Sequence, residues 1–153
     1  MPTNRQADQM IGADLQQFLA PSQAYAANTY HVALIPGQGL PALGLKVGSL
    51  ASFPLDVLYS GGKYLDLVID ITNANGGTLT VNIAGVDPLS GKSFTILTSL
   101  GLAANGTTVL RVGPALTPAA NLTVNDFIPF TWNLQLTVAT ATMTFSISAS
   151  QMP

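Results

Sequence analysis

Alternating apolar and polar positions dominate the chain between residues 64 and 97. A period of two residues is typical of half-buried strands, because successive side chains leave opposite faces of a strand. One such run begins at Tyr64 and a second begins at Thr78. The apolar positions are Leu65, Leu67, Ile69 and Ile71 in the first run, and Leu79, Val81 and Ile83 in the second. The pattern therefore predicts two strands, each with one face directed at a core.

Turn-forming residues separate these runs. The segment 73–77 reads NANGG, and its asparagines and glycines tolerate positive φ. The segment 87–91 reads DPLSG and precedes a third apolar stretch that ends at Leu97. We therefore predict a hairpin at each turn, and hence an antiparallel meander with one apolar face that another layer must cover.

The same alternation returns in the second half of the chain. Further strands are predicted over Thr107–Val112, over Thr131–Val138 and from Met143 onward, with a short strand near Val124. The apolar positions of the last two long strands are Trp132, Leu134, Leu136, Val138, Met143, Phe145 and Ile147. The predicted fold class is all-β: an antiparallel β-sandwich or jelly-roll-like barrel with an N-terminal arm containing a short helix.

The first 35 residues lack this alternation. Ile11, Leu15, Phe18 and Leu19 follow the i, i+4, i+7, i+8 spacing of one helix face. A single helix of about a dozen residues is marginal alone in water. It therefore docks on its own domain, on a neighbouring subunit or on another protein. These four side chains are our candidate partner-interface residues.

This change of pattern predicts two parts, an N-terminal arm over residues 1–35 and a β-sandwich domain over residues 36–153. Within residues 36–62, prolines and glycines exclude a long helix, yet the segment is too apolar for a solvated linker. We expect short or edge strands there, laid over the apolar face of the meander.

Charge is scarce along the whole chain. Charged residues make up 8% of the sequence, against about 25% in ordinary soluble proteins. A surface with so few charges favours coverage by partner molecules. The five basic residues do not cluster, which argues against a nucleic-acid partner, and no apolar run is long enough for a membrane-spanning helix.

Catalytic chemistry has little support in the sequence. His31 is the only histidine and there is no cysteine, so histidine clusters and thiolate metal sites are excluded. No G-x-S-x-G motif accompanies His31. We expect His31 to be capped or solvated, and we expect neither an enzyme nor a bound cofactor.

Aspartates supply the other candidate chemistry. Asp66 and Asp70 share a strand face but lie roughly 13 Å apart, too far for a glycosidase pair. Together with Asp56 and Asp87 they could converge on calcium, although no calcium-loop motif is present. Solvated or interface carboxylates are the alternative. Arg111 either pairs with one of these aspartates or reaches a neighbouring subunit.

Three segments carry a family resemblance. They are VNIAGVDPLSGKSFTIL at 81–97, TTVLRVGP at 107–114 and IPFTWNLQLTV at 128–138. Although segment 87–92 ends in Gly-Lys, it joins two predicted strands and lacks phosphate-loop spacing, which favours a hairpin turn. With these segments, residues 64–149 resemble small β-sandwich virion proteins of tailed bacteriophages.

The resemblance implies adhesion without catalytic residues. It leads us to expect a structural virion protein, foremost a capsid decoration or cement protein that stabilises the phage head by binding between capsid subunits. The implied partners are the major capsid protein or another virion protein, in a homo-oligomer for which a trimer is favoured. Such a protein is assembled in the host cytoplasm and resides in the virion. The alternative is a tail-tip or fibre module that binds a receptor or carbohydrate.

Overall fold

The computed structural model describes residues 15–35, 42–53, 56–60 and 62–152. Within these ranges the chain forms strands and one short 3₁₀ helix, η1 (Leu50–Ser52). The strands are β1 (Leu15–Tyr25), β2 (Asn28–Ile35), β3 (Ala42–Val47), β4 (Leu58–Tyr59), β5 (Tyr64–Asn73), β6 (Thr78–Val86), β7 (Ser93–Thr98), β8 (Gly106–Val112), β9 (Thr123–Val124), β10 (Thr131–Ala139) and β11 (Met143–Met152). The all-β fold class is therefore confirmed.

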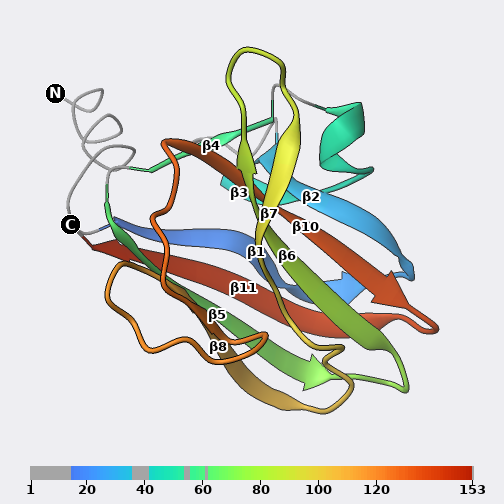
Figure 1. The fold of residues 1–153 in the computed structure, drawn as a ribbon. Helices are drawn as coiled ribbons and strands as arrows, with labels where there is room; N and C mark the ends of the chain where they lie inside the picture. Colours follow the sequence, from blue (N-terminus) through green and yellow to red (C-terminus); the bar gives the residue numbers. More distant parts are fainter. Residues whose placement is uncertain (1–14, 36–41, 54–55, 61, 153) are drawn as a thin grey trace, which may run out of the picture.

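The strands form two sheets that lie face to face (Figure 1). Sheet A has the order β1-β11-β5-β8-β9, and sheet B has the order β3-β2-β10-β6-β7 with β4 beside β10. The pairings between these strands are antiparallel, apart from the short parallel contact of β8 with β9. The predicted antiparallel β-sandwich is confirmed.

The order of strand pairing is that of a jelly roll. With the peripheral strands β3, β4 and β9 set aside, the pairs nest from the ends of the chain inward: β1 with β11, β2 with β10, β5 with β8 and β6 with β7. The chain thus resembles one long folded-back ribbon that has been rolled up. Pairing of β11 with β5 and of β10 with β6 then completes the two sheets.

The core lies between the sheets and is built by the alternating positions. Along β5 the residues alternate between half-buried and buried, so that Leu65, Leu67, Ile69 and Ile71 face the core. From sheet B, Leu79, Val81 and Ile83 of β6 and Trp132, Leu134, Leu136 and Val138 of β10 are buried in the same cluster. These inward positions are those that the period-two pattern predicted.

The predicted hairpin at residues 73–77 is wrong. A tight turn does form there, with Gly77 N–H donating to the Ala74 carbonyl at 2.8 Å and positive φ at Asn75 and Gly76. The strands on either side, however, belong to different sheets, with β5 in sheet A and β6 in sheet B. The turn therefore crosses the sandwich, and the two apolar faces meet across the core instead of lying side by side.

The second predicted hairpin, between β6 and β7, is confirmed. Asp87 N–H donates to the Lys92 carbonyl at 2.8 Å, and Gly91 has a φ of 69°. The Asp87 carboxylate accepts hydrogen bonds from Ser90 Oγ at 2.6 Å and Leu89 N–H at 3.1 Å. The Ser90 hydrogen bond is the main cause of a pKa below the usual range for Asp87. This hairpin extends past the sheets at the top of Figure 1.

The predicted N-terminal helix is wrong where the structure describes it. Residues 15–25 form β1, which pairs with β11 along sheet A, and residues 28–35 form β2, which pairs with β10 in sheet B. Two register shifts interrupt the β1–β11 pairing, between Phe18 and Ala20 and between Ala20 and Gln23. Leu19 and Ala20, at the first shift, are both buried, so strict alternation is lost at the end of the apolar stretch that suggested a helix. Residues 15–35 thus supply a strand to each sheet. That an arm exists among residues 1–14 stays a prediction.

The segment between β2 and β5 contains the predicted short and edge strands. β3 pairs with β2 at the margin of sheet B, and β4 adds two residues beside β10. Between them, η1 lies over the outer face of sheet B, where Leu50 is buried. Of this segment, η1 covers the outside of sheet B, whereas Leu43, Leu45 and Leu58 contact the core between the sheets.

Candidate functional site

Among the four residues predicted to contact a partner, Leu19 is the one whose side chain the structure describes. Leu19 is fully buried in the chain's own core, so it is unavailable to a partner. Leu15 and Phe18 lie in β1, at the register positions of Gln151 and Ser148. Ile11 lies outside the described residues. A partner-contact role for Ile11, Leu15 and Phe18 stays a prediction.

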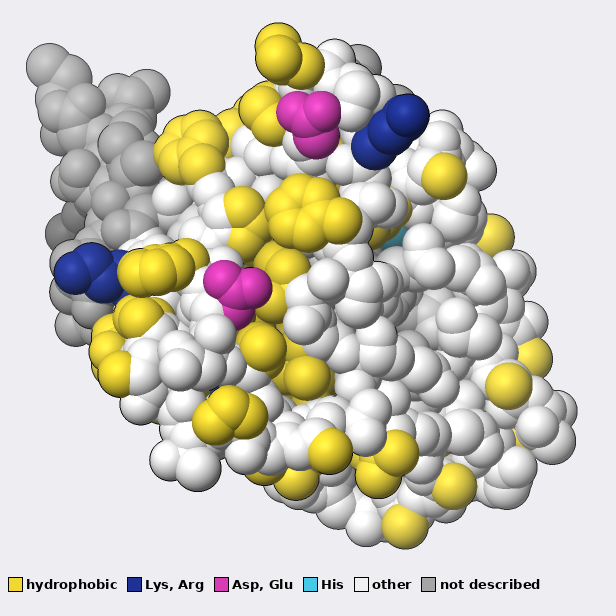
Figure 2. Space-filling model, viewed as in Figure 1, with side chains coloured by type: hydrophobic (Ala, Val, Ile, Leu, Met, Phe, Trp, Pro, Cys, Tyr) yellow, Lys and Arg dark blue, Asp and Glu magenta, His cyan; other side chains and the backbone are white. Residues whose placement is uncertain are grey.

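Exposed aromatic side chains gather at one end of sheet B. Phe130 is 61% exposed, Phe127 60% and Phe94 53%, and Tyr59 is also exposed. Strand pairing brings Tyr59, Phe94 and Phe130 to this end, and we call these three residues the aromatic end. Figure 2 shows hydrophobic side chains collected in the upper left and centre of the view, whereas the lower right is mainly white, that is, polar side chains and backbone.

Strand pairing places Tyr59 and Phe130 together. β4 pairs with the first residues of β10, so Tyr59 lies opposite Thr131. Ser60 N–H donates to the Phe130 carbonyl at 2.8 Å, which anchors the backbone immediately before β10. The two rings meet edge to face, with centroids 5.3 Å apart. This is a favourable aromatic geometry, but it leaves both rings accessible to solvent.

Phe94 lies at the same end of the sheet, on the strand next to Gly85. Trp132 pairs with Gly85 on β6, and Gly85 pairs with Phe94 on β7. A Cβ atom at Gly85 would overlap the Phe94 ring. The absence of a side chain at Gly85 therefore leaves room for the outer edge of the Phe94 ring, which remains half exposed.

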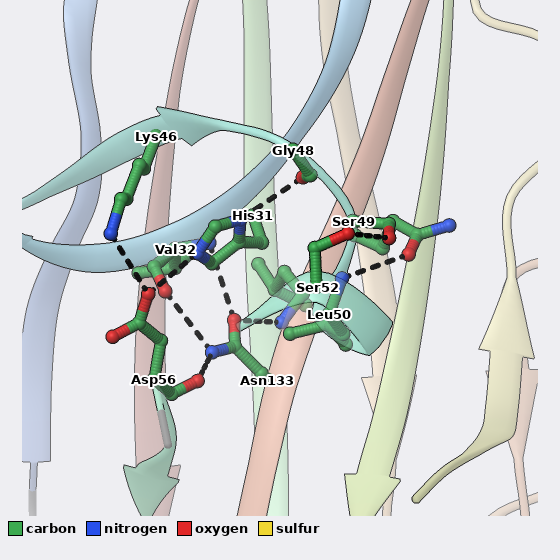
Figure 3. Close-up of polar contacts among 11 residues, drawn as sticks. His31, Val32, Lys46, Gly48, Ser49, Leu50, Ser52, Asp56 and Asn133 are labelled. Atoms are coloured by element: carbon green, nitrogen blue, oxygen red, sulfur yellow. Dashed lines mark hydrogen bonds and ion pairs between the residues drawn. The ribbon is translucent and has the colours of Figure 1, made fainter. Parts of the chain in front are cut away.

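A second cluster lies on the outer face of sheet B (Figure 3). His31 on β2 is completely buried and contacts Asp56 through Nε2 at 2.8 Å and the Gly48 carbonyl through Nδ1 at 3.0 Å. Its ring stacks on Phe53 with centroids 4.9 Å apart, and Lys46 Nζ lies 4.0 Å from the Phe53 centroid. Of the two predicted environments for His31, capped or solvated, the first is found: both ring nitrogens lie within hydrogen-bond distance of a partner, and the ring is buried.

Asn133 holds the same region from β10. Its side-chain amide donates to the carbonyls of Val32 and Asp56, and its oxygen accepts from the Val32 and Leu134 N–H groups. Asn133 is fully buried, so these bonds satisfy a polar group that would otherwise destabilise the fold. The cluster thus holds residues 48–53 and Asp56 against sheet B.

The remaining carboxylates do not converge. Asp66 pairs with Arg111, with Oδ1 and Nε 3.5 Å apart, which is one of the two roles expected for that arginine. Asp70 accepts a hydrogen bond from Thr107, and Asp87 lies in the β6–β7 turn. Over the described ranges no three His, Cys, Asp or Glu side chains come together in a way that could hold a metal ion. The calcium hypothesis therefore has no structural support.

Sequence reasoning missed both clusters. The aromatic end joins residues from three separate segments, and only strand pairing shows that they are neighbours. His31 and Asp56 are likewise 25 positions apart. The sequence feature that could have indicated an exposed aromatic cluster was the presence of phenylalanines near predicted turns, at 94, 127 and 130. In the part of the chain that the structure describes, no helix is long and apolar enough to cross a membrane.

Comparison with known proteins gives no family. No family model matches the chain, and no curated protein is significantly similar in sequence. Among solved structures, the cryo-EM structure of Broad Bean Stain Virus contains a chain with 12% identity and a TM-score of 0.40, covering 90% of this chain and 84% of that one.

Two further structures show weaker likeness. A chain of the Cowpea mosaic virus top component has 14% identity and a TM-score of 0.36, covering 92% of this chain and 84% of that one. Eiger TNF from S. frugiperda has 9% identity and a TM-score of 0.29, covering 84% of this chain and 94% of that one. Similarities of this size assign no function to the chain.

Proposed function

We propose that this chain is a structural virion protein, and specifically a decoration or cement protein that binds between the capsid subunits of a tailed bacteriophage. The observation that carries the proposal is the aromatic end. Three large rings, from β4, β7 and the residue before β10, stand exposed at one end of a charge-poor domain. Exposed aromatic groups of this kind are typical anchors of protein interfaces.

The fold and the composition are compatible with this role. Jelly rolls occur in capsid domains and in lectins, so the topology alone does not choose between them. The chain has five basic and seven acidic residues in 153 positions. A surface with so few charges loses little hydration free energy when a partner covers it. The proposed role is adhesive, with residence in the virion and no catalytic step; assembly as a trimer stays a prediction.

Burial of the aromatic end supplies the proposed binding energy. Removal of apolar surface from water contributes about 25 cal/mol per Å², before the cost of association is subtracted. Truncation of a well-buried interface aromatic typically costs about 2 kcal/mol or more, which is roughly thirty-fold in Kd. The edge-to-face packing of Tyr59 and Phe130 orients both rings in advance and so reduces the loss of side-chain freedom on binding.

Co-sedimentation with particles of the encoding virus tests the proposal. Purified protein is mixed with particles that lack it, and bound protein is measured with and without the paired substitutions Tyr59→Ser and Phe130→Ser. We expect the unaltered protein to bind and the variant to lose at least about thirty-fold in affinity. The matched control is Leu100→Ser with Leu122→Ser, which removes two exposed apolar side chains outside the aromatic end.

Equal binding by the variant and the unaltered protein would show that the aromatic end is not the contact. Failure of the unaltered protein to bind expanded capsids, with the protein located in the tail of dissected virions, would refute the capsid role.

The aromatic end also favours a second candidate, a receptor- or carbohydrate-binding module at a tail tip or fibre. Sugar-binding sites often use exposed aromatic rings as platforms, and Tyr59 and Phe130 form such a surface. A glycan array distinguishes the candidates. Binding to a defined glycan that is lost in the Tyr59 and Phe130 variant would place this candidate ahead of the first.

A further inference from the structure

We propose that Asn75 is a modification site, at which the folded chain converts an asparagine into aspartate and isoaspartate without an enzyme. The reaction needs only water, and it turns a neutral side chain into a negative one in a domain that has few charges. The proposal is independent of the virion role. It rests on the geometry of the turn at residues 73–77, which crosses the sandwich between β5 and β6.

The chemistry is an attack by the backbone on its own side chain. The amide nitrogen of the residue after an asparagine loses its proton to hydroxide and forms a bond with the side-chain Cγ. The Cγ–Nδ2 bond breaks, and the side-chain nitrogen takes a proton from water and leaves as ammonia. The product is a five-membered succinimide ring. Addition of one water molecule opens the ring at either carbonyl, which leaves aspartate or isoaspartate.

A following glycine removes the main obstacle to this attack, because it has no side chain to hinder the approach of its nitrogen. The sequence has two such pairs, Asn75-Gly76 and Asn105-Gly106, and each follows an alanine. All four residues are exposed, and no atom beyond the neighbouring residues lies within 4 Å of the position that a Cβ would take on either glycine. Sequence and exposure therefore do not distinguish the two pairs, so the distinction depends on the fold.

The backbone of Asn75 already has the positive φ that suits the ring. Asn75 has a φ of 50° and Gly76 a φ of 74°, and the Gly77 N–H donates to the Ala74 carbonyl at 2.8 Å, as in a type I′ turn. Ring closure fixes ψ near the value of position i+1 in a type II′ turn, a position that also requires positive φ. Rotation of the one peptide group between Asn75 and Gly76 interconverts the two turns, and glycine tolerates either sign of φ.

Little else holds the Asn75 side chain away from its own backbone. Its Nδ2 donates to the Thr142 carbonyl at 3.3 Å in an exposed position, where water can replace the hydrogen bond. Neither Asn75 nor Gly76 belongs to a strand. The attack therefore breaks one long hydrogen bond and no strand pairing.

Asn105 is held against the same attack. Its Oδ1 accepts a hydrogen bond of 2.8 Å from the N–H of Ala74, a buried residue that would lose this partner if the side chain turned away. Gly106 is the first residue of β8 and lies opposite Ile71 of β5. Asn105 also lacks the positive φ of Asn75. The fold thus directs the reaction to one of two pairs that are identical in sequence.

Conversion of Asn75 alters a contact between two turns. A carboxylate at this position cannot donate to the Thr142 carbonyl, and its charge would face that oxygen. Isoaspartate also adds a carbon atom to the backbone of the turn. The turn has little room to shift, because a Cβ on Gly77 would already overlap the Met143 side chain and the Ala141 carbonyl. We therefore expect the crossing turn to separate from the turn between β10 and β11 while the strands remain paired.

Peptide mapping of the full chain tests the proposal. Trypsin cuts after lysine and arginine, so Asn75 falls in the peptide 64–92 and Asn105 in the peptide 93–111. The folded protein is incubated in mildly alkaline buffer, and mass spectrometry with fragmentation locates the replacement of the side-chain NH₂ by OH. We expect conversion at Asn75, and a rate at Asn105 that is lower by about two- to tenfold or more, the factor expected for one hydrogen bond.

Two comparisons separate the effect of the fold from that of the sequence. In urea the two pairs should react at similar rates, because the unfolded chain has neither the turn nor β8. The variant Asn75→Gln has a longer side chain whose attack would need a six-membered ring, so the peptide 64–92 should lose its conversion. The matched control is Asn73→Gln, which alters an exposed asparagine of the same peptide and should leave the conversion at Asn75 in place.

Either of two results would overturn the proposal. One is a folded chain that converts Asn105 as fast as Asn75 or faster. The other is a folded chain that converts neither pair while the chain in urea converts both, because the turn would then protect Asn75 as well. If Asn75→Gln does not fold, the rates of the two pairs within the unaltered protein decide the question alone.

Discussion

Replacement of Leu19 by alanine distinguishes a core residue from a partner contact. Leu19 lies on β1 with no exposed surface, and it belongs to the cluster that also contains Tyr25 and Phe145. Removal of a leucine side chain from such a site costs about 2–5 kcal/mol, because transfer energy is lost and a cavity remains. For a chain of this length, a loss of about 3 kcal/mol lowers Tm by roughly 6–12 °C.

Urea unfolding followed by circular dichroism measures this loss, with thermal unfolding as a second readout. The control is Leu89→Ala, since Leu89 is 96% exposed at the tip of the β6–β7 hairpin and its loss should change stability by no more than about 0.5 kcal/mol. Our reasoning would be refuted if Leu19→Ala left the urea midpoint unchanged but abolished binding to particles, because Leu19 would then be an interface residue, as its sequence spacing predicted.

Two further predictions concern the N-terminal region. Removal of residues 1–14 leaves every described strand in place, so circular dichroism should show a folded chain; if these residues form an arm, particle binding should weaken. Removal of residues 1–27 deletes β1, uncovers the edge of β11 and opens the core, so a chain that still unfolds cooperatively at the original temperature would contradict the sheet A topology. Burial, with a smaller effect from the nearby Tyr30, raises the pKa of Tyr25 to about 12. The unfolded chain therefore ionises this tyrosine first, and stability should decline between about pH 10 and 12; Tyr25→Phe should reduce that decline, and an equal decline in the variant would show that Tyr25 is not its source.

Local periodicity predicted the strands well but could not assign them to sheets. The inward positions of β5, β6, β10 and β11 follow from side-chain alternation, a property of each strand alone. Turn residues at 73–77 are equally suited to a hairpin within one sheet and to a crossing between two sheets. The distinction depends on which strands pair with β5, and its partners β8 and β11 lie far along the chain.

Irregular strands and long-range contacts explain the other failures. The first register shift in β1 follows Phe18, and Leu19 and Ala20 are both buried, so the alternation expected of a strand is lost there. The aromatic end and the contact between His31 and Asp56 depend on strand pairing between distant segments, and no local pattern records such contacts.

The most direct test of the proposed function is a cryo-EM map of the intact particle that carries this chain. We expect density for the jelly roll on the capsid, between neighbouring capsid subunits, with Tyr59 and Phe130 buried against them. A map in which the chain lies in the tail, or on the capsid with its aromatic end facing solvent, would contradict the proposal.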